Sequence, residues 1–328
     1  MIYERIHDIV MDDIFLRVTD VVPDVDIYLK LEGLNPTGSI KIKPAISMIR
    51  DAETRGLLRP GSRVVESSSG SLGIALAMVC AARSYRFLCV TDPNISAQSL
   101  AIMKALGADV VQIDRRDANG GYLGSRIAYI NELMAADPGI VWLNQYANSA
   151  NWIAHAETTA AAIHAELSEL DYLFVGAGTA GTLMGCVRYF RHASPGTKVV
   201  AVDAVGSVSF GGPAGARHIP GIGTSSRPEI LRPDEVEDLV LVDECEAVRV
   251  CRWLARERGI FVGGSTGSIV AAIIQRAPDL PPGSRVVGIA PDLGDRYAQT
   301  VYDDTWVDER LMTSDDALPT IDLDPVRG

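Results

Sequence analysis

The chain has 328 residues, of which 47% are hydrophobic and 22% charged, and its formal net charge is −12. This length fits about two domains or one large α/β unit with a well-buried core. The acidic balance argues against a nucleic-acid-binding or anionic-membrane-binding protein, because phosphates repel such a surface. Any anionic ligand must therefore meet a local positive pocket.

Cysteine usage and the N-terminal stretch predict a cytoplasmic protein. The five cysteines form no CxxC pair, and three of them (Cys80, Cys89 and Cys186) lie inside apolar runs, as buried thiols in a reducing compartment do. The stretch MIYERIHDIVMDD is too charged for a signal or transit peptide, and no uncharged apolar run approaches the ~18 residues needed to span a bilayer. The five histidines show no metal-ligand spacing, so no metal is expected.

From residue 26 onward, short β-branched runs alternate with helix-like segments. Strands are expected over 26–32, 62–67, 86–92, 109–114, 140–145, 171–176, 198–204, 238–244 and 285–292. Helices are expected after Lys41 and over 71–82, 97–107, 122–136, 151–167, 182–192 and 246–259. Such apolar strands, separated by helices, are typical of parallel sheets covered on both faces. The pattern predicts a doubly wound α/β protein.

One long segment and the C-terminal end depart from this alternation. Residues 204–230 (AVGSVSFGGPAGARHIPGIGTSSRPEI) hold so much Gly, Pro and Ser that regular structure is not expected. A loop of that length inside a compact domain is more often functional than idle. The final stretch, SDDALPTIDLDPVRG, is expected to be a loose tail.

Three predicted strand-to-helix junctions are rich in Gly, Ser and Thr: ESSSGSLG (66–73), VGAGTAGTLMG (175–185) and VGGSTGSIVAA (262–272). At such junctions the free N–H groups of a helix start can receive an anion. Three of them suggest a ligand with more than one anionic group, bound at the carboxyl ends of the strands. The alternative is purely structural, because Ser and Thr are good N-caps and Gly permits close packing.

A second functional alternative also exists at the middle junction. Gly176, Gly178 and Gly181 form a G-x-G-x-x-G after a strand, and Asp203 ends the next strand, as in dinucleotide-binding folds. This pattern would indicate a nicotinamide-dependent oxidoreductase. However, the motif lies in mid-chain and explains neither of the other two junctions.

Four ordered motifs, NPTGSIK, SSSGSLG, GAGTAGT and GGSTGS, resemble those of the fold type II pyridoxal-phosphate enzymes. This tryptophan-synthase-β-like family includes cysteine synthase and cystathionine β-synthase, and the resemblance runs from about residue 26 to about 306. Other stretches, such as DANGGYLGSRIA, LNQYANSANW and PDLGDRYAQTVYDDTW, resemble the subgroup that makes N-(2-amino-2-carboxyethyl)-L-glutamate, a source of 2,3-diaminopropionate for siderophores and peptide antibiotics.

The resemblance implies a site residue by residue. Lys41 matches the lysine that holds pyridoxal 5'-phosphate as a Schiff base and then removes the substrate Cα proton. The residues matching the phosphate cradle are Gly178, Thr179, Ala180, Gly181 and Thr182. The remaining cofactor contacts would be Ser71 and Ser265, and the residues that bind the substrate carboxylate would be Ser68, Ser69, Gly70 and Gln145.

Ser265 matches the residue that faces the pyridine nitrogen of the cofactor. Its identity as a serine bears on the type of reaction. A neutral hydroxyl cannot hold a proton on that nitrogen as a carboxylate would, so the ring is a weaker electron sink. Elimination and replacement at Cβ suffer least, because the leaving group carries electrons away.

The chain departs from the family at several positions. Ile42 and Lys43 stand where relatives have Asp-Arg, Ser71 replaces an Asn that contacts the cofactor 3-hydroxyl, and Ala180 replaces a glycine. The segment VMDDIFLRV replaces a Gly-x-Thr-Pro run. Lys43 is expected to give electrostatic or structural support, since relatives have arginine there.

The function expected from the resemblance is β-replacement on O-phospho-L-serine with the amine of L-glutamate as nucleophile. Arg126 and Tyr146 would hold the second anionic substrate, although Arg126 also fits a solvated residue of an amphipathic helix. The alternatives are cysteine synthase chemistry, with O-acetylserine or O-phosphoserine and sulfide, and a catalytically impaired cofactor-binding regulatory protein.

The resemblance also implies two α/β domains with the cofactor in the cleft between them. The smaller, mobile domain is expected over 39–148, and the larger one would combine 1–38 with 149–310, leaving 311–328 as a tail. Closure of the smaller domain would exclude water from the reaction. A homodimer that acts on small amino-acid substrates is expected.

Overall fold

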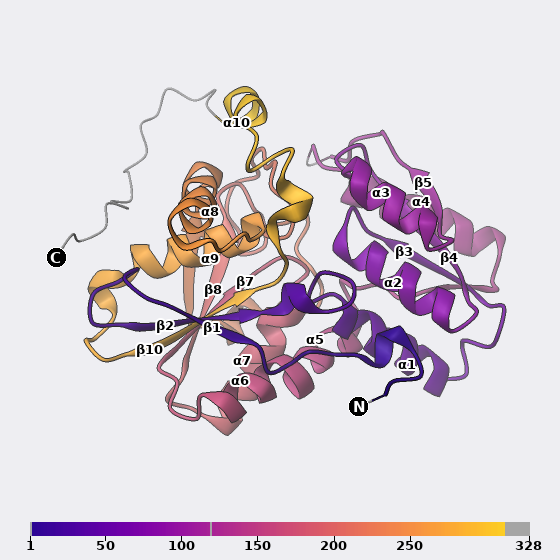
Figure 1. The fold of residues 1–328 in the computed structure, drawn as a ribbon. Helices are drawn as coiled ribbons and strands as arrows, with labels where there is room; N and C mark the ends of the chain where they lie inside the picture. Colours follow the sequence, from indigo (N-terminus) through magenta and orange to yellow (C-terminus); the bar gives the residue numbers. More distant parts are fainter. Residues whose placement is uncertain (1, 119, 312–328) are drawn as a thin grey trace.

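The computed structural model describes residues 2–118 and 120–311, which form two α/β units around two separate sheets (Figure 1). The larger sheet has six strands in the order β1-β2-β10-β7-β8-β9, and the smaller has four in the order β5-β4-β3-β6. Strands of the larger sheet are β1 (Phe15–Val18), β2 (Asp26–Leu31), β7 (Tyr172–Gly176), β8 (Lys198–Ala204), β9 (Asp238–Val242) and β10 (Arg285–Ala290). Strands of the smaller sheet are β3 (Arg63–Ser67), β4 (Arg86–Thr91), β5 (Asp109–Gln112) and β6 (Ile140–Trp142).

All strand pairs are parallel except one at the edge of the larger sheet. There β1 runs antiparallel to β2, with Phe15 opposite Lys30 and Val18 opposite Ile27. Strand β1 was not predicted from the sequence. Its four residues, FLRV, form no long apolar run, and apolar and polar residues do not alternate regularly in them. The larger sheet is therefore mixed, as is common when an antiparallel strand closes one edge.

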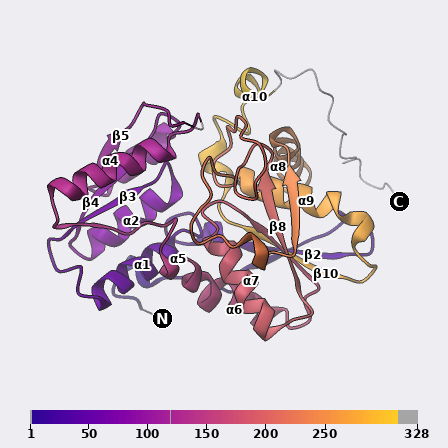
Figure 2. The same ribbon diagram turned by 180° about the vertical axis from the view of Figure 1, so that it is seen from behind.

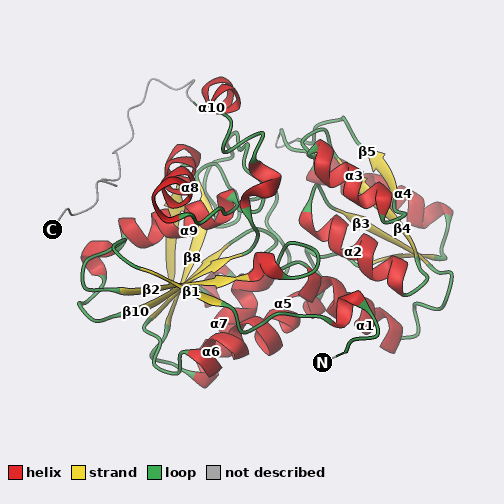
Figure 3. Ribbon diagram, viewed as in Figure 1, coloured by secondary structure: helices red, strands yellow, loops and turns green. Residues whose placement is uncertain are grey.

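Helices cover both faces of each sheet, as predicted for a doubly wound protein (Figures 2 and 3). In the larger unit, α8 (Glu244–Arg258) and α9 (Gly264–Gln275) pack on one face, and α6 (Ala161–Glu166) and α7 (Gly181–Ala193) pack on the other. In the smaller unit, α1 (Ile42–Thr54), α2 (Ser71–Ala82) and α3 (Ala97–Ala105) share one core, and α4 (Leu123–Ala136) covers the opposite face. Helix α5 (Ser149–Ala154) packs against α1 and α7, and α10 (Asp304–Arg310) follows the last strand.

Apolar side chains explain why these strands are central. Leu173, Phe174 and Val175 of β7 are fully buried, as are Val286 and Val287 of β10, because helices cover both faces of these strands. Burial of each such side chain contributes about 1.5–3 kcal/mol. The larger sheet thus provides a rigid base for the loops at its carboxyl edge.

Two expected elements differ in the structure. The helix expected over 151–167 consists of α5, a π-helix, η3 (His155–Ala160), and α6. The junction at 262–272 does not follow a strand, because Val262 forms only an isolated bridge with Leu293 after α8. Apart from Ala204, which ends β8, the irregular segment 204–230 contains no helix or strand, as expected.

The domain boundaries remain a prediction, because the sheets alone do not fix where one unit ends. The expected tail lies outside the described residues except for Leu311, which is buried in the core of the larger unit. In the described part of the chain, no helix is both long and apolar enough to cross a bilayer.

Candidate active site

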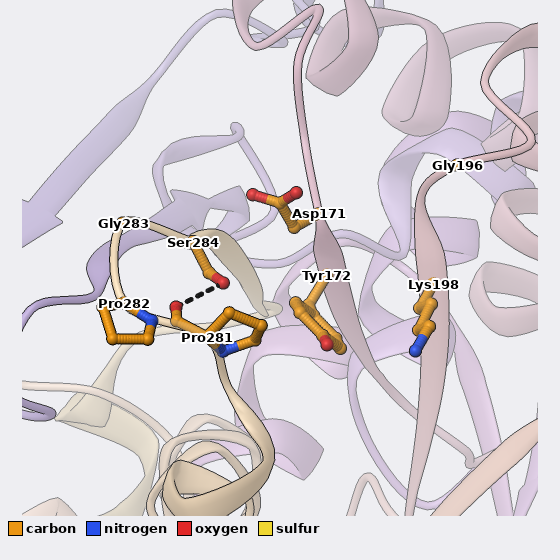
Figure 4. Close-up of a pocket in the computed structure, with 8 residues that line it drawn as sticks. All are labelled: Asp171, Tyr172, Gly196, Lys198, Pro281, Pro282, Gly283 and Ser284. Carbon is orange, nitrogen blue, oxygen red and sulfur yellow. Dashed lines mark hydrogen bonds between the residues drawn. The ribbon is translucent and has the colours of Figure 1, made fainter.

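Most of the predicted site residues lie in loops that follow the carboxyl ends of strands. The opposite end of the larger sheet carries a separate surface depression of about 280 Å³ (Figure 4). Its lining includes Asp171, Lys198 and Ser284, which stand at the amino ends of β7, β8 and β10. None of the predicted site residues lines this depression, so we place the candidate site at the carboxyl edge.

Lys41 is the N-cap residue of α1 and is partly buried. Burial lowers the pKa of its ammonium group, and the nearby Asp292 carboxylate opposes that shift. Within the described residues, no hydrogen bond or ion pair occupies its Nζ. A lysine with a lowered pKa and a free amine is chemically suited to nucleophilic and base chemistry.

The loop before α7 is built as an anion cradle. No acceptor is found among the described residues for the backbone N–H groups of residues 178–183, and α7 has no side-chain N-cap. Ala180 is left-handed, with φ of 66°. A row of free N–H groups at the start of a 13-residue helix attracts an anion such as a phosphate. The five residues predicted to cradle the cofactor phosphate lie in this loop and in the first two positions of α7.

The same loop is enclosed by two other segments. A Cβ on Gly178 would lie 2.4 Å from the carbonyl oxygen of Gly221, and a Cβ on Gly221 would lie 2.3 Å from Ser265 Oγ. Gly221 belongs to the irregular segment 204–230, and Ser265 lies in the first turn of α9. The structure thus brings the predicted phosphate loop and the predicted pyridine-nitrogen ligand together through a segment that was expected to be functional.

Asn151 of α5 supports the cradle from behind. Its Nδ2 donates to the Gln145 carbonyl oxygen at 2.7 Å and to Thr179 Oγ1 at 3.4 Å. Its Oδ1 is buried without a hydrogen-bond partner in the described part of the chain, and a Cβ on Gly181 would lie 2.0 Å from that atom. Asn151 therefore joins Gln145 to the phosphate loop.

The loop before α2 carries the residues predicted to bind a substrate carboxylate. Ser68 is buried, and its Oγ accepts hydrogen bonds from the N–H groups of Gly70 and Gly73. A Cβ on Gly70 would meet no atom within 4 Å. Gln145 Nε2 donates to the Ser67 carbonyl oxygen at 2.8 Å. The predicted glutamine therefore lies beside this loop, and space is open in front of it.

Glu66 fixes this loop from within the smaller sheet. Its carboxylate accepts hydrogen bonds from the N–H groups of Ser67 and Gln145 and from Trp142 Nε1. The side chain is fully buried, and burial raises its pKa to about 7, although these hydrogen bonds and Arg126 oppose the rise. Glu66 thus ties together two of the segments that carry predicted substrate contacts.

Ser71, where the family has asparagine, contacts the larger unit. Its Oγ accepts a hydrogen bond from Arg296 Nη1 at 3.1 Å, and Arg296 Nη2 donates to the Thr37 carbonyl oxygen. Arg296 lies in a 3-10 helix, η6 (Gly294–Tyr297), that follows β10. Gly38 is left-handed, and a Cβ there would lie 2.6 Å from the guanidinium. This arginine therefore bridges the two units at the site.

Arg126 and Tyr146 lie together in the smaller unit. Arg126 is 6% exposed and forms an ion pair with Asp92 at 3.2 Å, so the interpretation as a solvated helix residue is wrong. The ion pair is made by Nη1, whereas Nε has no hydrogen-bond partner in the described part of the chain. Burial raises the pKa of Tyr146, and Arg126 opposes that rise. A buried guanidinium that still has an unpaired donor can receive an additional anion.

The departures after Lys41 have structural explanations. Ile42 is fully buried in the core that α1 shares with α2 and α3, so this position is a packing position in this chain. Lys43 is also buried and pairs with Glu32 at 2.6 Å and with Asp12. Asp12 belongs to the segment VMDD that replaces the family's usual run. The expectation that Lys43 gives electrostatic support agrees with these contacts.

Several residues at the site were not assigned by sequence reasoning. Glu66, Asn151, Asp292 and Arg296 stand inside or beside motifs that carried the resemblance, so the signal was present but no role was attached. His155 had only a weak signal, a polar run within an apolar helix. Tyr297 donates to Asp292 at 2.8 Å, and burial raises the pKa of Asp292 to about 6.

Comparison with known proteins finds relatives over most of the chain. Two curated relatives carry the name N-(2-amino-2-carboxyethyl)-L-glutamate synthase. The protein of Ralstonia nicotianae is 44% identical over 283 residues, covering 86% of this chain and 84% of its own length. The protein of Cupriavidus metallidurans is 43% identical over 306 residues, covering 91% and 90%.

Solved structures of enzymes with other names share the overall fold. O-ureido-L-serine synthase superposes with a TM-score of 0.86 at 35% identity, covering 93% of this chain and 96% of the other. The O-acetylserine-dependent cystathionine β-synthase from Helicobacter pylori gives 0.85 at 30%, covering 92% and 98%. The family described as pyridoxal-phosphate dependent enzyme matches residues 17–292. This match overrides the dinucleotide interpretation of Gly176, Gly178 and Gly181. The chain therefore belongs to the family of pyridoxal-phosphate-dependent enzymes, with the fold type II architecture.

Proposed function

We propose that this enzyme catalyses β-replacement on O-phospho-L-serine with L-glutamate, giving N-(2-amino-2-carboxyethyl)-L-glutamate. The product would supply 2,3-diaminopropionate to a siderophore or peptide antibiotic. The names of the two curated relatives support this proposal. The structural observation that carries it is the buried Arg126 guanidinium, whose Nη1 pairs with Asp92 and whose Nε has no hydrogen-bond partner in the described part of the chain. As a nucleophile, glutamate brings two carboxylates into the site, whereas sulfide brings none.

The residues present fit pyridoxal 5'-phosphate. We propose that Lys41 Nζ holds it covalently, that the free N–H groups before α7 bind its phosphate, and that Ser265 faces its ring nitrogen. Ser71 Oγ accepts a hydrogen bond from Arg296, and its hydroxyl proton would still be able to donate to the cofactor. When bound, the cofactor supplies an electron sink that stabilises negative charge at the substrate Cα.

The chain's own groups can then carry out proton transfer and orientation. Lys41 Nζ takes the Cα proton of the activated serine, and the Cβ–O bond breaks with its electron pair leaving on phosphate. The glutamate amine forms the new C–N bond at Cβ and loses a proton, and Lys41 returns a proton to Cα. The lowered pKa of Lys41 supports this role, because the amine must be neutral to act as a base.

Substrate orientation is assigned to two groups of residues. Ser68, Ser69, Gly70 and Gln145 would hold the α-carboxylate of the serine substrate, since their loop is open and Glu66 fixes its base. Arg126 and Tyr146 would hold a carboxylate of glutamate.

A substrate matrix tests the proposal. Purified holoenzyme is incubated with O-phosphoserine or O-acetylserine, each with glutamate or sulfide, and products are identified by mass spectrometry. We expect the condensed product from O-phosphoserine and glutamate. Cysteine formed from sulfide alone would instead support cysteine synthase chemistry. Absence of any product, with cofactor bound, would support the regulatory alternative.

Variants of Arg126 test the second subsite. We expect Arg126→Lys, which keeps the pairing with Asp92, to raise the KM for glutamate by about tenfold, as the loss of charge-assisted hydrogen bonds predicts, and to leave the KM for O-phosphoserine unchanged. Arg59→Lys, at an exposed position, is the matched control. An equal rise of both KM values would remove Arg126 from the glutamate subsite.

The assembly and location remain proposals as well. We propose a cytoplasmic homodimer, which is the usual form of the family. All five cysteines are free, and four of them are buried, as suits a reducing compartment. Light scattering coupled to size-exclusion chromatography measures the mass of the assembly. We expect the mass of a dimer, and the mass of a monomer would contradict the proposed homodimer.

A further inference from the structure

A continuous line of buried polar side chains connects α1 to the phosphate loop. Lys43 Nζ donates to Thr159 Oγ1 at 3.1 Å, Thr159 Oγ1 lies 3.1 Å from His155 Nδ1, and His155 Nε2 lies 3.3 Å from Thr182 Oγ1. His155 and Thr159 are fully buried. The line begins at the Lys43–Glu32 ion pair and ends on a residue of the anion cradle.

The direction of each hydrogen bond follows from the donors available. The Lys43 ammonium group can only donate, so Thr159 Oγ1 accepts from it. In the described part of the chain, the only other hydrogen-bond partner of that oxygen is His155 Nδ1. If Nδ1 carried a proton, the Thr159 hydroxyl proton would be buried without an acceptor, which costs about 1–3 kcal/mol. Nδ1 therefore accepts.

The second half of the line follows from the first. Burial lowers the pKa of His155 well below its ordinary value, and Lys41 and Lys43 lower it further, so the ring is neutral. A neutral ring with an accepting Nδ1 carries its proton on Nε2. Nε2–H then donates to Thr182 Oγ1, and the Thr182 hydroxyl proton is free to point elsewhere.

Close packing keeps the line in place. A Cβ on Gly185 of α7 would lie 2.6 Å from the Trp152 carbonyl oxygen and 2.7 Å from His155 Cβ. His155 opens the π-helix η3, which packs directly on α7. Single-turn π-helices often mark functional sites. The absence of a side chain at residue 185 allows the imidazole to reach the first turn of α7.

We propose that Lys43, Thr159 and His155 are positioning residues that orient the Thr182 hydroxyl as a hydrogen-bond donor to the cofactor phosphate. A phosphate dianion only accepts hydrogen bonds. If the Thr182 hydroxyl donated its proton to His155, it could not donate to the phosphate. The inference rests on the proposed place of the phosphate at residues 178–182, but the tautomer of His155 is a property of the protein alone.

The first test is the His155 tautomer. Long-range ¹⁵N–¹H correlation spectra of the holoenzyme separate the two neutral tautomers, and the His155 signal is identified as the one absent from His155→Gln. We expect a neutral ring with the proton on Nε2. A ring protonated on Nδ1, or a doubly protonated ring, would overturn the proposed direction.

The second test is cofactor affinity, measured by quenching of intrinsic fluorescence in the titrated apoprotein. We expect Thr159→Val to weaken cofactor binding about tenfold, the size expected for one hydrogen bond to a charged group, and Thr159→Ser to restore it. Thr158→Val is the matched control, because in the described part of the chain Thr158 Oγ1 donates only to the carbonyl oxygen of Ala154, the last residue of α5.

Each outcome bears on the inference. The expected tautomer together with weaker binding in Thr159→Val alone supports it. The expected tautomer with equal affinities for Thr159→Val and Thr158→Val would overturn the link to the cofactor, even if the wild type makes the proposed product. Failure of the proposed function would appear separately, as a holoenzyme that binds cofactor tightly but does not form the product.

Discussion

The loops before α7 and before α2 have similar compositions, but they are built in opposite ways. Both are short, rich in Gly and Ser or Thr, and followed by a helix of the doubly wound fold. In the loop before α7, Gly178 and Gly181 have no room for a Cβ. In the loop before α2, Gly70 faces open space.

This difference separates two kinds of binding. The packed loop has fixed, unpaired N–H groups, which suit a permanently held phosphate. The open loop is supported by hydrogen bonds that involve Glu66, Gln145 and Arg296, and the open space at Gly70 suits a ligand that enters and leaves. Glycine therefore serves tight backbone packing in one loop and free access in the other.

The largest expected effect comes from adding one methyl group to each loop. Gly178→Ala would push a Cβ against the Gly221 carbonyl oxygen, at an overpacking cost of about 1–3 kcal/mol, and should abolish cofactor retention. Gly70→Ala should leave cofactor content and melting temperature near wild type while raising the KM of the serine substrate. Cofactor absorbance, thermal melting and kinetics are measured for both variants. Equal loss of cofactor in the two variants would contradict the proposed difference between the loops.

The next effect concerns pH. The pKa of Glu66 is raised from 4.5 to about 7, so the folded chain binds this proton more tightly than the unfolded chain. The contribution of Glu66 to stability is therefore greatest below pH 4.5 and falls as the pH rises towards about 7, by up to about 3 kcal/mol. Glu66→Gln should flatten this part of the profile.

Urea unfolding between pH 4.5 and 8 measures this difference. Asp203 and Asp292, whose pKa values burial raises to about 6, contribute in the same direction in both proteins and cancel in the comparison. An unchanged slope in Glu66→Gln would show that Glu66 is ionised at low pH.

A smaller effect is expected from the bridge between the two units. Arg296→Lys keeps the charge but cannot span both Ser71 and the Thr37 carbonyl oxygen, so the open loop loses one support. We expect the KM for the serine substrate to rise about three- to tenfold, with cofactor content unchanged. Steady-state kinetics, with Arg59→Lys as the control variant, measures the change in KM. A loss of bound cofactor instead would show that Arg296 supports the packed loop.

The smallest effect should come from relieving backbone strain in the packed loop. Ala180 has φ of 66°, a conformation that costs a non-glycine residue about 1–2 kcal/mol. Ala180→Gly removes that strain but increases the freedom of the unfolded chain by about 0.5–1 kcal/mol. We expect the melting temperature to rise by about 2 °C or less, as calorimetry can show. A clear drop would mean that the alanine methyl group makes contacts worth more than its strain.

Residues near one another in the chain could be interpreted from the sequence, because their signals are local. The apolar runs of β3, β7, β8 and β10, the glycine-rich loops and the irregular segment 204–230 all occur as expected. The motif around Lys41 indicated the cofactor and the family, which the comparisons confirm. The edge strand β1 was not predicted because its four residues, of which only Val18 is buried, carry too little periodicity.

Contacts between distant residues depended on the tertiary structure. Spacing alone could not show that Arg126 is buried against Asp92, that Lys43 reaches Thr159, or that Arg296 reaches Ser71. Each pair is separated by at least 34 residues, and its geometry depends on how helices and sheets pack. Close packing often requires a glycine at the contact. The amino-acid sequence therefore specified the chemistry available at each loop, and packing decided which groups meet and which donors remain free for a ligand.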